Sequence, residues 1–165
     1  MEFRITNAQR TDVVDTAQIR RLALDASRQL GLRTRGRIEI TFLDARRMQG
    51  LNKQFLRHDR STDVLSFRYD APPAPPRNGH PIVGEIFIAP SQAQRYAKRH
   101  GFCYAEELSR YVVHGLLHWR GEEDRTPAQQ RNMRALEDGV LAMRRKPTER
   151  AAQRDKKTLE TSRRI

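Results

Sequence analysis

The sequence predicts one α/β domain of the α+β kind, in which helices cover a small mixed four-stranded sheet. Apolar segments follow the order strand, helix, strand, helix, two strands and three helices, which favours that architecture. The 165 residues suffice for one domain with a core and are too few for two ordinary ones. Apolar periodicity stops near residue 143, so we expect the domain to span residues 1–143 and a disordered basic tail to follow over 144–165.

Strands and helices alternate in the first half of the chain. Residues 1–5 start a strand, and Asp12 is expected to cap a helix that Gly31 ends. The apolar stripe of this helix has helical periodicity and consists of Ile19, Leu22, Ala23, Ala26 and Leu30. Residues 37–43 alternate apolar and polar side chains, as a half-buried strand does, and a helix over about 44–55 follows directly.

Two more strands and three more helices are expected in the second half. Residues 64–67 and 82–88 are short β-branched or aromatic runs, joined by a proline-rich loop over 71–81. Helices are expected to begin at three places, the last with a threonine N-cap before proline: Ser91, Tyr104 and Thr126–Pro127. The last helix carries an apolar stripe of Met133, Leu136, Val140 and Met143.

The chain is strongly basic, with a formal net charge of +12. Lys and Arg displace counterions from a phosphate backbone, so nucleic acid is the first class of partner and an anionic membrane surface the second. No apolar stretch approaches the roughly 20 residues of a spanning helix, and no signal segment opens the chain. Cys103 is the only cysteine, which excludes an internal disulfide and fits a reducing cytoplasm, and we expect its thiol to be buried or idle.

His114, His118 and Asp124 form a candidate metal site. Two histidines four residues apart lie on one face of a helix, so both rings can reach one divalent ion. Gly121 can end that helix in the left-handed conformation, and Asp124 then follows the turn. Two imidazoles and a carboxylate suit zinc with one position left for water, which is the arrangement of a catalytic site. The alternative is a pair of solvated or hydrogen-bonded histidines without a metal.

The spacing is also that of the zinc hydrolases with an H-x-x-x-H-x-x-G helix, so the metal helix is expected to be zincin-like. In the peptidases of that class a glutamate directly after the first histidine is the general base. This chain has Gly115 there. A small metallopeptidase is therefore the less favoured enzyme class.

Two segments resemble the YbeY family of metal-dependent endoribonucleases. Residues 51–67, read as N-x-x-[FY] followed by D-x-x-T-[DN]-V-L-S-F, carry one motif, and His114 to Asp124 resemble the family's H-G-x-L-H-L-x-G-Y-D-H signature. Gly84-Glu85-Ile86 is similar to its G-[DE]-I strand. The family's third histidine falls on Asp124 here, and its Tyr-Asp pair falls on Glu122 and Glu123. The resemblance covers about residues 1–143.

The resemblance implies hydrolysis of single-stranded ribosomal RNA, with one Zn²⁺ per chain, during maturation of the 3′ end of small-subunit rRNA. An arginine that many family members place after N-x-x-[FY] falls on Leu56, so either the neighbouring Arg57 takes its catalytic role or the role is lost. Arg60, Arg68 and Lys98 are candidates for contacts with RNA, and solvated surface charges otherwise. The alternative that is not an enzyme is a ribosome-assembly or RNA-binding factor with a structural metal.

Overall fold

A computed structural model describes residues 1–56, 62–70 and 79–143 of the chain. Four strands form one mixed sheet in the order β1-β2-β4-β3. Three of them run parallel, and the fourth, β3, runs antiparallel to β4: β1 (Glu2–Asn7), β2 (Arg37–Phe42), β4 (Ile82–Ile88) and β3 (Val64–Arg68). The small mixed sheet expected from the sequence is thereby confirmed.

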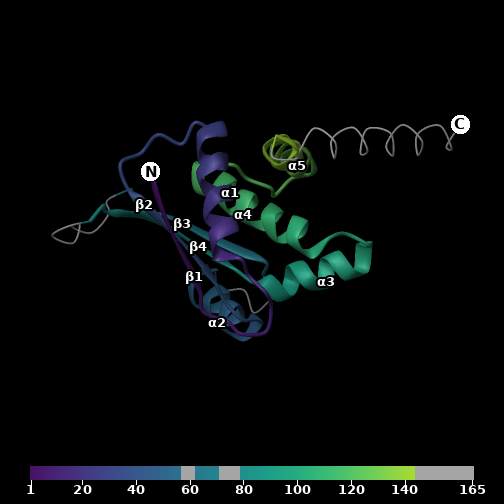
Figure 1. The fold of residues 1–165 in the computed structure, drawn as a ribbon. Coiled ribbons are helices and arrows are strands. Elements are labelled where there is room, and N and C mark those ends of the chain that lie inside the picture. The colour runs from purple at the N-terminus through teal and green to yellow at the C-terminus, as the bar shows by residue number, and fades with distance from the viewer. Residues whose placement is uncertain (57–61, 71–78, 144–165) are drawn as a thin grey trace, which may run out of the picture.

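Helices cover both faces of this sheet (Figure 1). Helices α1 (Thr16–Gln29) and α4 (Tyr104–Arg120) pack on one face, and α2 (Ala45–Leu56) lies against the other. Helices α3 (Pro90–His100) and α5 (Pro127–Ala142) pack against α4. In the described part of the chain, no helix combines the length and the apolar character needed to cross a membrane.

The core consists of two apolar layers because side chains alternate along each strand. Strand β4 buries Ile86 and Ile88 in the larger layer, beneath α1 and α4. The intervening Phe87 packs with Met48 of α2 and Leu65 of β3 in the smaller layer. Helix α4 is thus fixed on the sheet, and it carries both candidate histidines.

The first helix begins later than the sequence predicted. Asp12 is not its N-cap, because the backbone N–H of Asp12 donates to Gln9 Oε1 in the loop that precedes the helix. Asp15 caps α1 instead, and its carboxylate accepts from the backbone N–H of Gln18 at 2.9 Å. Asp15 lies three residues after Asp12, and the buried side chain of Gln9 excludes Asp12 as the cap by organising residues 9–12 into a loop.

Two further expectations need correction at the surface. Met143 is 65% exposed and stands at the C-cap of α5, so the core stripe of that helix ends at Val140. Cys103 is exposed, so of the two expected alternatives for its thiol, buried or idle, the buried one is wrong. The N-cap Thr126 is confirmed, because it forms a capping box with Gln129. The predicted tail and most of the proline-rich loop, residues 144–165 and 71–78, lie outside the described residues.

Candidate metal centre

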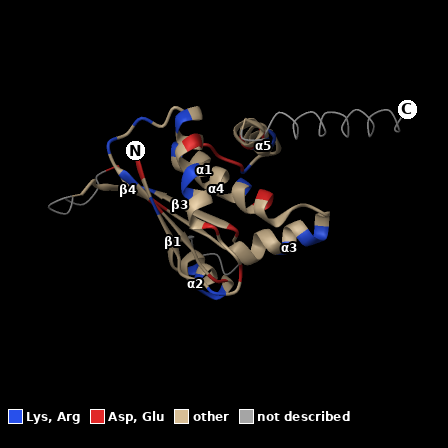
Figure 2. Cartoon of the chain, in the orientation of Figure 1, with Lys and Arg blue, Asp and Glu red and all other residues tan. Residues whose placement is uncertain are grey.

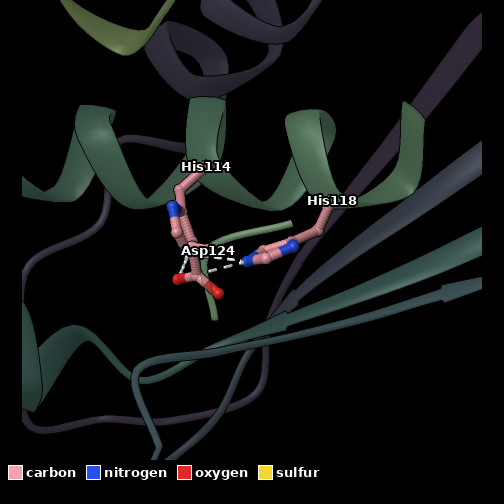
Figure 3. Close-up of side chains that lie close together, drawn as sticks. All are labelled: His114, His118 and Asp124. Atoms are coloured by element: carbon pink, nitrogen blue, oxygen red, sulfur yellow. Dashed lines mark hydrogen bonds and ion pairs between the residues drawn. The ribbon is translucent and has the colours of Figure 1, made fainter. Parts of the chain in front are cut away.

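Helix α4 presents His114 and His118 side by side on one face, one turn apart. Its other faces bury apolar side chains such as Val112 and Leu116, which fix the rotation of the helix about its axis. Gly121 ends the helix with φ 110°, a left-handed conformation that favours glycine. The chain then turns back, and Asp124 lies opposite the two rings (Figure 3).

The contact between α4 and the sheet explains the glycine between the histidines. A Cβ at Gly115 would lie 2.5 Å from Ile86 Cγ2, closer than real Cβ atoms approach. Ser66 of β3 also donates its hydroxyl to the Gly115 carbonyl at 3.1 Å. Position 115 therefore faces the sheet at close range, and it has no room for the carboxylate that a peptidase of this helix class needs next to its first histidine.

Three side-chain atoms converge at one point. His114 Nε2 and His118 Nε2 are 2.9 Å apart, and Asp124 Oδ2 lies 3.7 Å from the first and 3.8 Å from the second. A triangle with these sides has a centre about 2.0 Å from each corner, which matches the usual bond lengths of zinc to imidazole nitrogen and carboxylate oxygen. The residues present therefore fit a single divalent ion.

The hydrogen-bond partners of the other ring nitrogens strengthen this fit. His118 Nδ1 lies 2.8 Å from the carbonyl oxygen of Glu122, which can only accept, so Nδ1 carries the hydrogen. His114 Nδ1 lies 2.8 Å from Glu137 Oε1 and donates to that carboxylate. In the neutral rings both Nε2 atoms then carry lone pairs that face each other and Asp124. The two Nε2 atoms and the carboxylate oxygen are all hydrogen-bond acceptors, with no hydrogen between them. Such a set of lone pairs is what a metal ion binds.

Glu137 of α5 holds His114 in place. Its carboxylate is buried, with 6% of the side chain exposed, and accepts from His114 and from Arg110 Nη1 at 2.9 Å. Burial alone would raise the pKa of Glu137, but the hydrogen bonds from His114 and Arg110 outweigh it and lower the pKa below its usual value. Burial disfavours the imidazolium of His114, yet the hydrogen bond and charge of Glu137 raise the pKa of His114. The carboxylate thus fixes both the tautomer and the basicity of the ring.

Glu137 and its partner Arg110 were not predicted from the sequence. A signal was present, because Glu137 lies between Met133 and Val140 on the apolar stripe of α5. A charged residue on a buried helix face needs a partner, and here it has two. Arg110 also pairs with Asp138 at 2.8 Å, so its guanidinium is engaged by acids.

A hollow of about 290 Å³ opens beside His114 and Asp124. Asp63, which precedes β3, lines it together with Glu107 and Arg134. Asp63, from the motif over residues 51–67, thus lies beside the same hollow as His114 and Asp124 of the histidine motif. Glu107 is 5% exposed, and burial raises the pKa of its carboxyl group against the smaller opposing effect of Arg110. Glu107 consequently retains a proton to higher pH than an exposed glutamate does.

The structure brings together only some of the site residues that were predicted from the sequence. Arg57 and Arg60 lie outside the described residues, so the structure assigns them no position. Arg68 pairs with Asp70 at 3.2 Å and stands over the ring of Trp119, and it does not line the hollow at His114. Lys98 lines a neighbouring hollow on α3. Contacts of these residues with RNA stay predictions.

Comparisons with known proteins found a matching family model, similar sequences and a solved structure with the same fold. The family model described as "Endoribonuclease YbeY" matches residues 4–144. A relative with that name from Flavobacterium johnsoniae is 34% identical over 108 residues, which cover 66% of this chain and 73% of the relative. A second, from Salinibacter ruber, is 38% identical and covers 63% and 68%. The solution structure of TM1509 from Thermotoga maritima shares the fold, with a TM-score of 0.55 and 21% identity over 86% of this chain and 90% of that one.

Proposed function

This chain belongs to the YbeY family of endoribonucleases, and we propose that it cleaves single-stranded RNA with one zinc ion held by His114, His118 and Asp124. Maturation of ribosomal RNA is the role of the family, and the proposed substrate is the 3′ region of small-subunit rRNA. The observation that carries the proposal is the convergence of two imidazole lone pairs and one carboxylate on a common point.

Zinc, when bound, supplies a Lewis acid that lowers the pKa of water from about 16 toward about 7 and polarises a phosphoryl oxygen. The protein contributes the orientation of the ligands. Glu137 and the Glu122 carbonyl accept hydrogen bonds from Nδ1 of His114 and His118. These bonds fix both rings with their Nε2 lone pairs directed at the metal position. Asp124 in place of a third imidazole adds a negative charge, so water at this site should be somewhat less acidic than at a three-histidine site.

Cleavage of a phosphodiester also needs positive charge near the phosphate, because negative charge grows on its oxygens in the transition state. We propose Arg57 for this role, in place of the family arginine that falls on Leu56. Arg134 is a second candidate, since it lines the hollow beside His114 and Asp124. Arg110 is a poorer one, because Glu137 and Asp138 already bind its guanidinium.

The test compares two substrates and two proteins. Wild type and His114→Ala are incubated with a single-stranded fragment of small-subunit rRNA and with casein, with zinc and with a chelator. We expect wild type with zinc to cleave only the RNA, and His114→Ala to cleave neither. RNA cleavage that survives His114→Ala would contradict the metal mechanism. Tight RNA binding without zinc-dependent cleavage would instead indicate an assembly factor with a structural metal, and casein cleavage a peptidase.

A further inference from the structure

Three aromatic side chains gather at the C-terminal end of α3. The ring of Tyr96 lies 4.3 Å from that of His100, and both rings lie near Phe102, with centroids 6.2 and 6.1 Å away. Both contacts of Phe102 are stacked, with interplanar angles of 28° and 24°. We call Tyr96, His100 and Phe102 the aromatic platform.

The end of the helix explains how Phe102 joins the other two rings. Gly101 adopts φ 71° and stops α3 in the left-handed conformation. The backbone N–H of Phe102 then donates to the Ala97 carbonyl at 2.9 Å, which turns the chain back beside the last helical turn. Phe102 stays 55% exposed in this position. A large apolar ring held at the surface by a defined turn is a candidate contact for a ligand.

Basic side chains line a hollow together with Tyr96 of the platform. Helix α3 contains Arg95, Lys98 and Arg99 and no acidic residue, and Figure 2 shows basic residues at its C-terminal end. These three side chains line a hollow of about 660 Å³, in which Asp63 is the single carboxylate. Among the described residues, none of the three takes part in an ion pair. Their charges are therefore available to an anionic ligand.

The hollow on α3 adjoins the one at the metal centre. Tyr96 lines both, and so do Asp63 and Tyr111. A chain of nucleotides bound at His114 and Asp124 can therefore continue past Tyr96 onto α3.

We propose that the aromatic platform stacks unpaired bases of the RNA substrate, while Arg95, Lys98 and Arg99 hold the adjoining phosphates. This inference rests on the proposed function and names a subsite for it. Alternation of aromatic rings and cations suits single strands, because unpaired bases expose their faces for stacking and a duplex does not. Stacking of this kind tolerates any base, so the platform would add affinity and selectivity for single strands without a sequence preference.

Binding of two matched probes tests the proposal. The zinc-loaded full-length protein is titrated into a short fluorescein-labelled 2′-O-methyl single strand and into an abasic strand of equal length, with fluorescence anisotropy as readout. We expect Phe102→Ala to weaken binding of the strand with bases by at least about fivefold and to leave binding of the abasic strand unchanged. Phe102→Trp should restore the binding, and Val13→Ala, at another exposed apolar residue, should bind like wild type. Arg99→Gln should weaken binding of both probes, because both carry phosphates.

Two results would overturn the proposal: Phe102→Ala binding both probes as wild type does, or losing equal affinity for both. Cleavage of unmodified RNA by the same preparations separates the two claims. Cleavage by wild type without any effect of Phe102→Ala on binding refutes the platform alone, whereas loss of base-dependent binding without cleavage by wild type refutes the nuclease alone.

A cross-link offers an independent readout of position. Cys103 is the only cysteine of the chain, is exposed, and directly follows Phe102. A thiol-reactive photo-cross-linker on Cys103 should attach to the strand with bases, and an excess of unlabelled single strand should compete it away. Undiminished cross-linking in the presence of that competitor, or none at all, would contradict RNA binding at the platform, and cross-links to another protein in a mixture with RNA would indicate a protein-binding face.

Discussion

Replacement of Glu137 by glutamine tests whether the buried carboxylate orients the metal ligand. The side chain accepts from His114 Nδ1 at 2.8 Å and from Arg110 at 2.9 Å. A glutamine has one oxygen for these two donors, and its NH₂ group would meet the other donor hydrogen to hydrogen. The ring of His114 then loses its fixed direction, and Arg110 loses a buried charge partner.

The expected loss of zinc affinity is about 10- to 100-fold, the usual effect of removing such a partner, or roughly 1.4–2.8 kcal/mol. Asp138→Asn is the matched control, since Asp138 binds the same guanidinium at 2.8 Å from the same helix but is 58% exposed. We expect its zinc affinity to change by less than about twofold, as for an exposed ion pair. Competition against a chromophoric chelator measures both affinities, and urea denaturation in chelator measures both stabilities.

Equal zinc affinities of wild type and Glu137→Gln would refute the orienting role. Equal losses of zinc affinity in Glu137→Gln and Asp138→Asn would also refute it, because the effect would then come from Arg110 rather than from the contact with His114.

Three further predictions concern stability. Gly115→Ala should destabilise the fold by up to about 2 kcal/mol, since overpacking against Ile86 costs about 1–3 kcal/mol and the gain in helix propensity returns about 1 kcal/mol. Gly139→Ala in α5 is the control, because a Cβ added there meets no atom within 4 Å, and it should stabilise the fold by up to about 1 kcal/mol. Equal urea midpoints of Gly115→Ala and Gly139→Ala would contradict the close approach of α4 to the sheet. Thr126→Ala should cost about 1 kcal/mol in the same assay because it removes the capping box of α5, and an unchanged midpoint would show that the cap contributes nothing.

Much of the fold was predictable from local patterns. Spacing placed His114 and His118 on one helix face, and Gly121 indicated the end of that helix, because both signals act within a few residues. The order of strands and helices predicted a mixed sheet. The start of α1 was not predictable, because the choice between Asp12 and Asp15 depends on hydrogen bonds made by Gln9.

The environment of the candidate metal centre was harder to predict than the three residues themselves. The contact of Glu137 with His114 joins residues 23 apart in sequence, and only the packing of α5 on α4 brings them together. The approach of Asp63 to the same hollow depends on the position of β3 at the edge of the sheet. The aromatic platform likewise depends on the turn at Gly101, which places Phe102 beside Tyr96.

Zinc binding by Asp124→Ala tests the central claim most directly. Asp124 has 40% of its side chain exposed, so its removal should leave the fold intact while it removes one of three converging ligands. Metal analysis of protein purified without chelator should find one zinc per wild-type chain and much less in Asp124→Ala, with unchanged circular dichroism. A folded Asp124→Ala that retains one zinc per chain, at the affinity of wild type, would show that His114, His118 and Asp124 do not form the site.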